Sequence, residues 1–166
     1  MPTWKLGAGV LAAAAVAGAA AAQTPAGLTL AGLGGRGASV SLAEVAALPR
    51  ATVHVVQHDQ PHDFSGPLAL DLLARVGAPH GEALRGRALG YVVVARGRDG
   101  YVAALALAEC DPAIRPAERV IVADREDGRP LPAAEGPLRL VIEGDARPAR
   151  AVRMLAGLSL VDLGAR

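Results

Sequence analysis

Short blocks of apolar residues, separated by glycine, proline and charged turn residues, follow one another from residue 28 to residue 163. Blocks of about four to eight residues that are rich in Val, Ile, Leu and Thr are typical of strands. The pattern therefore predicts seven or eight strands rather than long helices. They cover 28–30, 51–57, 91–95, 101–105, 120–123, 138–142, and one or two segments between 149 and 163.

Helices are predicted at only three places, and each is short. Ser41 and Glu44 have the spacing of a capping box ahead of a helix over 42–48. Pro67 is suited to the first turn of a second helix, and a third covers 107–110. Strands and helices do not alternate regularly, so the sequence favours a mixed α+β domain over a parallel α/β fold.

The first residues have the three-part pattern of a secretory signal peptide. Lys5 supplies the positive charge, 6–21 is uncharged and apolar, and Ala-Ala-Ala at 20–22 is a cleavage site. We expect a signal peptide at 1–22, a protein exported to the periplasm or secreted, and no membrane span after cleavage; an uncleaved anchor is the alternative. The remainder, 23–166, is predicted to form a single domain.

Composition narrows the possible partners. The 17 Lys and Arg residues nearly balance the 16 Asp and Glu residues, so no strong field attracts nucleic acid. Cys110 is the only cysteine, which excludes an internal disulfide. The simplest interpretation of Cys110 is a small buried apolar residue, and a reactive thiol or metal ligand is the alternative.

A polar segment after the second predicted strand carries metal-binding side chains. His58, Asp59 and His62 would meet at the tip of a hairpin, and two imidazoles with a carboxylate suit Zn²⁺, Cu²⁺ or Fe²⁺. The alternative is a solvated polar turn over 57–63, in which the aspartates cap local backbone amides.

Four arginines gather near the C-terminal strands and could hold a phosphate, sulfate or carboxylate group. Because acidic residues are interleaved with them, a salt-bridge network is the alternative. Arg139 lies inside an apolar strand, where its charge needs a partner or a cleft. No serine lies in a G-x-S-x-G elbow, and no catalytic residue is assigned. The arginines are Arg139, Arg147, Arg150 and Arg153.

Several motifs, taken in order, resemble the sulfite-oxidase-type molybdopterin-binding domain over residues 28–163. The segments are 64–73 (FSGPLALDLL), 99–101 (DGY), 127–132 (DGRPLP) and 136–141 (GPLRLV). The last two are the most specific, because six residues each stand in the right order and spacing. The resemblance implies a mixed β-sheet with a partly barrel-like core and two or three short helices.

The same resemblance implies a molybdenum–pterin cofactor and oxidoreductase chemistry. In that family a cysteine thiolate near the end of a strand ligates the metal, and basic residues hold the pterin phosphate. The matching strand here, 52–58, has no cysteine, and Val55 or Val56 stands at the ligand position. The metal ligand expected of an enzyme is therefore missing from that strand.

Three functions follow from the sequence. The first is binding of a pterin-like or other anionic small ligand through the four arginines, without assigned catalysis. A cofactor-free accessory module for an exported redox partner is the second. The third is transition-metal binding through His58 and His62.

Overall fold

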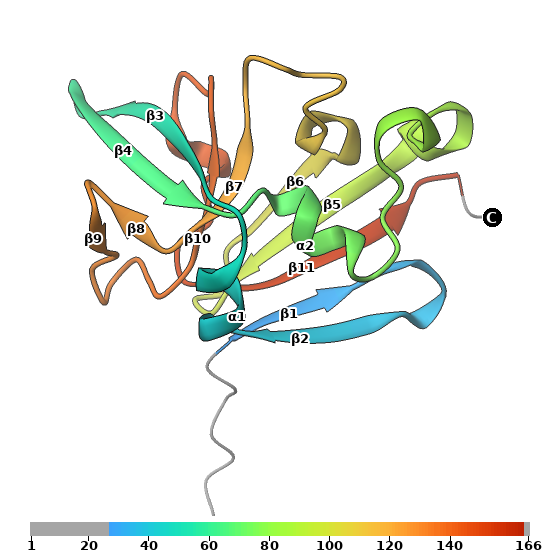
Figure 1. Ribbon diagram of the computed structural model, residues 1–166, viewed down its shortest axis with the longest axis horizontal. Helices are drawn as coiled ribbons and strands as arrows, with labels where there is room; N and C mark the ends of the chain where they lie inside the picture. Colours follow the sequence, from blue (N-terminus) through green and yellow to red (C-terminus); the bar gives the residue numbers. More distant parts are fainter. Residues whose placement is uncertain (1–26, 165–166) are drawn as a thin grey trace, which may run out of the picture.

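The computed structural model describes residues 27–164, and the predicted signal peptide at 1–22 lies outside them (Figure 1). In this part no helix has the length and apolar character needed to cross a bilayer. The strands are β1 (Gly27–Ala31), β2 (Gly37–Ser41), β3 (Ala51–Gln57), β4 (Gln60–Gly66), β5 (Tyr91–Gly97), β6 (Val102–Ala106), β7 (Val120–Ala123), β8 (Arg125–Glu126), β9 (Arg129–Pro130), β10 (Arg139–Ile142) and β11 (Leu155–Asp162).

The helices are few and short, as the sequence predicts. Two are α-helices, and the others are single 3₁₀ turns. They are α1 (Leu42–Ala47), α2 (Ala69–Ala74), η1 (Leu33–Gly35), η2 (Gly81–Ala83), η3 (Gly86–Gly90), η4 (Leu107–Cys110) and η5 (Pro148–Arg150). The mixed α+β class is confirmed.

The strands form three separate sheets. A five-stranded sheet has the order β2-β1-β11-β5-β6, with β1 and β11 parallel and the other pairs antiparallel. The others are β10-β7 and β3-β4-β8-β9, which lies beside the large sheet in Figure 1. Closure of a barrel would require the two edge strands of one sheet to pair. Edges β2 and β6 do not pair, so the expectation of a partly barrel-like core was wrong for the described residues.

The two-stranded sheet separates two hydrophobic clusters. Every residue of β7 and β10 is buried, and successive side chains point to opposite faces. Leu140 and Ile142 belong to the larger cluster, beneath the five-stranded sheet and α2. Val141 belongs to the smaller cluster, with Val53 and Phe64 of the β3–β4 hairpin. Arg139 has the same parity as Val141, so β10 directs its side chain towards the smaller cluster.

The predicted polar turn over 57–63 was too long. Gln57 pairs with Gln60, so only His58 and Asp59 form the turn between β3 and β4. Both have positive φ, 51° and 62°, as a two-residue type I′ turn requires. β2 was also missed, and a predicted strand beginning at residue 149 is instead η5 followed by a loop.

Both hydrogen bonds of a capping box are present at the start of α1. The Ser41 hydroxyl accepts the Glu44 N–H at 3.2 Å, and Glu44 Oε2 accepts the Ser41 N–H at 2.8 Å. Ser41→Ala should lower the free energy of unfolding by about 1 kcal/mol, measured by urea denaturation. Ser39→Ala, at an exposed position of the same strand, should change it by less than about 0.5 kcal/mol. If the free energy of unfolding fell equally in both variants, the two capping hydrogen bonds would contribute no measurable stability.

Candidate functional site

Arg139 is the most unusual side chain of the described part. It is 1% exposed, yet it lies in a strand whose other residues are Leu140, Val141 and Ile142. Its guanidinium carbon lies over the Phe64 ring, 4.8 Å from the ring centre, which is a cation–π contact. A buried charge without good partners is costly, so its surroundings are informative.

The protein supplies only part of what this guanidinium can bind. Nη1 of Arg139 donates to Glu135 Oε2 at 2.6 Å, whereas its Nε–H has no acceptor within residues 27–164. Arg153 Nε lies 3.5 Å from the other oxygen of Glu135, so two guanidinium groups share one carboxylate. Burial lowers the pKa of Arg139, Glu135 opposes that shift, and Arg153 adds to it. The charge of Glu126 also acts on Arg139, so Glu135 is not the only carboxylate that balances the two guanidinium groups.

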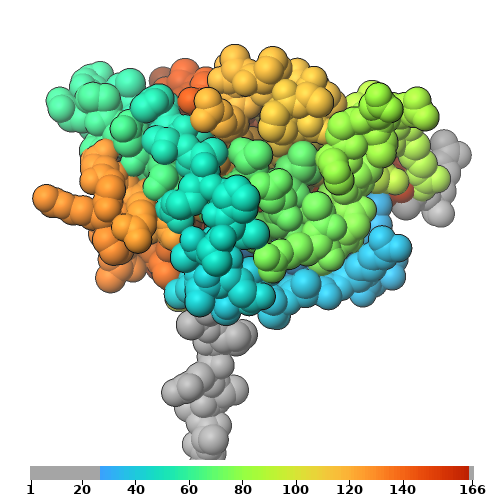
Figure 2. Space-filling view, in the orientation of Figure 1, coloured from blue at the N-terminus to red at the C-terminus, as the bar shows by residue number. Residues whose placement is uncertain are grey.

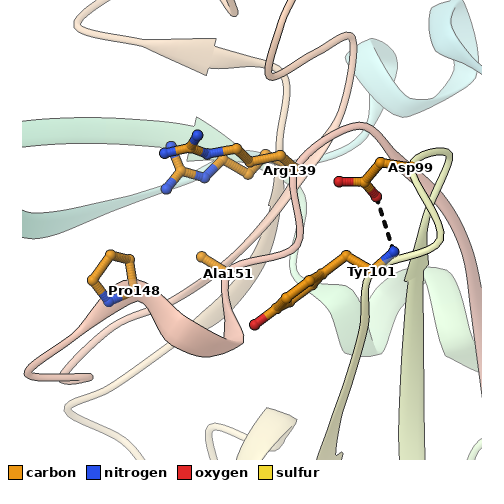
Figure 3. Close-up of a pocket in the computed structure, with 6 residues that line it drawn as sticks. Asp99, Tyr101, Arg139, Pro148 and Ala151 are labelled. Carbon is orange, nitrogen blue, oxygen red and sulfur yellow. Dashed lines mark hydrogen bonds between the residues drawn. The ribbon is translucent and has the colours of Figure 1, made fainter.

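A cavity of about 270 Å³ lies against these two arginines (Figure 3). Its other walls come from the β5–β6 turn and from η5. Tyr101 points its ring towards the η5 segment, and its hydroxyl donates to the Ala149 carbonyl at 2.6 Å. Asp99 Oδ1 accepts the Tyr101 N–H at 3.0 Å. Both groups are thus engaged with backbone. The lining residues are Asp99, Tyr101, Arg139, Pro148, Ala151 and Arg153.

The structure divides the four predicted arginines. Only Arg139 and Arg153 line the cavity. Arg150 donates to both oxygens of Asp145, at 3.1 and 2.6 Å, and to Glu109 at 2.9 Å. The hydrogen bonds that Arg150 donates to Asp145 are the main reason that the pKa of Arg150 is raised. Arg150 therefore belongs to a salt-bridge network, which was the alternative that the sequence offered. Arg147 is exposed, immediately precedes η5 and does not line the cavity.

The predicted histidine set is also divided. His58 and Asp59 form the tip of the β3–β4 hairpin, whereas His62 pairs with Val55 further along it. Among the described residues, the donor atoms that gather within 4.8 Å of one another are those of His62, Glu126 and Asp127. The structure therefore brings His62 to a different turn from the one that the sequence suggested.

Cys110 matches the simple interpretation of a small buried residue. It is 2% exposed at the end of η4, within the larger hydrophobic cluster. Burial, and after it the charge of the neighbouring Glu109, raise the pKa of its thiol to about 12. A thiol with this pKa is protonated at neutral pH, and the thiolate is the form that ligates metals.

The residues present do not fit a thiolate-ligated molybdenum. At the position of the expected ligand, Val55 is buried in the smaller cluster and Val56 is 63% exposed. The chain has no cysteine other than Cys110. The strand that would carry the metal thus offers only aliphatic side chains. We therefore derive no reaction step through that group.

The fold and the cavity together define a mixed α+β domain with an arginine-lined pocket. No family model and no curated protein sequence matches the chain. Among solved structures, it is similar to the sulfane dehydrogenase SoxCD from Paracoccus pantotrophus, with a TM-score of 0.61 and 17% identity. The match covers 84% of this chain and 39% of that chain. At this identity the likeness shows the fold alone, and it supports the sulfite-oxidase-type resemblance at that coarse level.

Sequence reasoning missed several residues of the site. Phe64 contacts the Arg139 guanidinium, and Asp99 and Tyr101 form part of the cavity wall. Glu135, in contrast, was among the acidic residues expected to pair with the arginines. The motif at 99–101 identified the hairpin, but nothing local indicated that the hairpin faces η5. The hydrogen bond from Tyr101 to Ala149 joins residues 48 positions apart.

Proposed function

We propose that this chain is an exported binding domain of sulfite-oxidase-like fold that takes a small anionic ligand between Arg139 and Arg153. One observation carries the proposal: a buried arginine with an unpartnered Nε–H lies against a cavity that a second arginine also lines. Guanidinium groups recognise carboxylate, phosphate and sulfate through paired N–H donors. An anion there would supply the acceptor that the Arg139 Nε–H lacks among the described residues.

The size of the cavity limits what can enter. A volume of about 270 Å³ lies just below the range for small-molecule sites, which is roughly 300–1,000 Å³. The cavity suits a small oxyanion or one anionic group of a larger molecule, such as the phosphate of a pterin-like ligand. The resemblance makes molybdopterin one ligand to include in a screen, while the missing thiolate favours binding without molybdenum chemistry.

A cofactor-free accessory role for an exported redox partner is the second candidate. The observation that favours it is the pair of valines at the expected ligand position. Calorimetric titration of the purified chain with phosphate, sulfate, acetate and a phosphorylated pterin separates the two candidates. Saturable binding of one anion per chain supports the ligand-binding domain, whereas no heat with any of the four supports the accessory module.

Glu135 provides a sharper test, because its carboxylate occupies the two arginines that the ligand would use. Glu135→Gln should tighten anion binding by about tenfold, which corresponds to about 1.4 kcal/mol, since it removes a competing negative charge. Glu109→Gln is the matched control, because Glu109 pairs with Arg150 and Arg115. Weaker binding by the Glu135 variant, measured in the same titration, would contradict a ligand that competes with this carboxylate.

A further inference from the structure

A second polar site lies where the β3–β4 hairpin meets the β8–β9 hairpin. β4 pairs with β8, and the two hairpins lie side by side at one end of the molecule (Figures 1 and 2). His62 projects from β4 on the same face as Phe64, whereas Glu126 ends β8 and Asp127 begins the turn that follows. Three donor groups from two hairpins therefore converge.

Their spacing is that of ligands around one ion. His62 Nδ1 lies 3.0 Å from Asp127 Oδ2 and 3.3 Å from Glu126 Oε1. In a tetrahedral zinc site each nitrogen or oxygen lies about 2.0–2.2 Å from the ion, which places the ligand atoms roughly 3.3–3.6 Å from one another. The contact of His62 with Glu126 has this length, and that with Asp127 would lengthen by a few tenths of an ångström. A single Nδ1–H can donate one good hydrogen bond, yet two carboxylate oxygens face this nitrogen. A cation bound to all three atoms satisfies both carboxylates at once.

The Asp127 carboxylate is held in place by the backbone. Its Oδ1 accepts the Asp63 N–H at 2.9 Å, and the Asp127 N–H donates to the Asp63 carbonyl at 2.8 Å. The turn has positive φ at Asp127 and Gly128, 50° and 76°, as expected for a type I′ hairpin turn. With Oδ1 fixed by this amide, Oδ2 is left directed at His62. The hydrogen bond from Asp63 is also the main cause that lowers the pKa of Asp127.

The group opens into a cavity rather than into the core. This cavity, of about 550 Å³, leaves room for water or a ligand to complete the coordination of an ion. Arg129 also borders it, so two carboxylates and one guanidinium face the same space. The lining residues are His62, Glu126, Asp127, Arg129, Pro130 and Pro132.

The geometry points to a binding site for one divalent transition-metal ion, of the Zn²⁺ class, at His62, Glu126 and Asp127. One imidazole nitrogen and two carboxylates suit Zn²⁺ better than Ca²⁺ or Mg²⁺, which require more oxygen ligands. The site does not depend on the anion-binding proposal, since none of its three ligands lines the arginine cavity. It also differs from the hairpin-tip set of His58, Asp59 and His62.

The test is equilibrium dialysis of the purified chain against Zn²⁺, with bound metal counted by mass spectrometry. One zinc per chain is expected, and His62→Ala or Glu126→Gln should weaken binding at least tenfold. Asp127→Asn should do the same while its Oδ1 still accepts the Asp63 N–H. The thermal unfolding of each metal-free variant checks that the fold is kept.

Matched controls lie on the opposite face of the same hairpin. His54 pairs with Asp63 there, so His54→Ala should leave zinc binding unchanged, as should His58→Ala at the tip. Absence of zinc from the unmodified chain would overturn the proposal, and so would loss of zinc in the His58 variant. The Co²⁺-loaded chain tests the ligand set without any substitution. A thiolate-to-cobalt charge-transfer band would place the ion at Cys110 instead, and its absence with weak d–d bands supports nitrogen and oxygen ligands.

Discussion

Arg139→Met is expected to weaken small-anion binding by at least thirtyfold while the fold remains intact. Removing a buried, hydrogen-bonded charge from its partner costs about 2–5 kcal/mol of binding. Methionine suits the position, because the side chain faces the smaller cluster with Val141 and the thioether can replace the guanidinium over the Phe64 ring. Glu135 keeps Arg153 as a partner after this change.

The stability of this variant should change much less than its affinity. Removing one partner of a buried ion pair is destabilising when the other is left buried and unpaired, but the Glu135 side chain is 21% exposed and retains Arg153. Titration with the anion that binds best, together with urea unfolding, measures both quantities. Arg147→Met, at an exposed position beside η5, is the control and should change neither. Retained affinity in the Arg139 variant would show that the anion binds elsewhere.

Phe64→Ala should produce the largest loss of stability, about 3–5 kcal/mol. The ring is fully buried at the centre of the smaller cluster and supports Arg139 on one side. Its removal leaves a cavity and deprives the guanidinium of its cation–π contact. Urea denaturation, followed by circular dichroism, measures the free energy of unfolding.

Two further variants separate the effect of the Phe64 side-chain volume from that of its cation–π contact with Arg139. Phe64→Leu retains most of the apolar volume and should cost clearly less than the alanine variant. Val56→Ala, on the exposed face of the paired strand, should change stability by less than about 0.5 kcal/mol. A loss of less than about 1 kcal/mol for Phe64→Ala would contradict a structural role for the smaller cluster.

The apolar pattern was sufficient for the strands whose side chains fill the core. β7 is a continuous apolar run that is buried on both faces, β10 has three apolar residues after Arg139, and β5 begins with the apolar run 91–95. β4 was missed because its first half, Gln60 to Asp63, is polar and contains a proline. Its strand conformation results from pairing with β3, which no local pattern indicates.

The candidate site was predictable only in part. The position of Arg139 in an apolar strand correctly indicated a charge that needs a partner or a cleft. The division of the arginines depends on contacts distant in sequence, such as that of Arg150 with Glu109, 41 residues away. His62 and Asp127 are separated by 65 residues and meet only through the pairing of β4 with β8. Spacing along the chain therefore suggested the wrong neighbours for His62.

The most direct test of the anion site observes the arginine side chains themselves. In a ¹⁵N NMR titration with phosphate, the Nε–H signals of Arg139 and Arg153 should shift together along one saturating curve. The signal of Arg147 should remain in place. Unchanged Arg139 and Arg153 signals, with only weak and unsaturated drift at exposed arginines, would contradict the account.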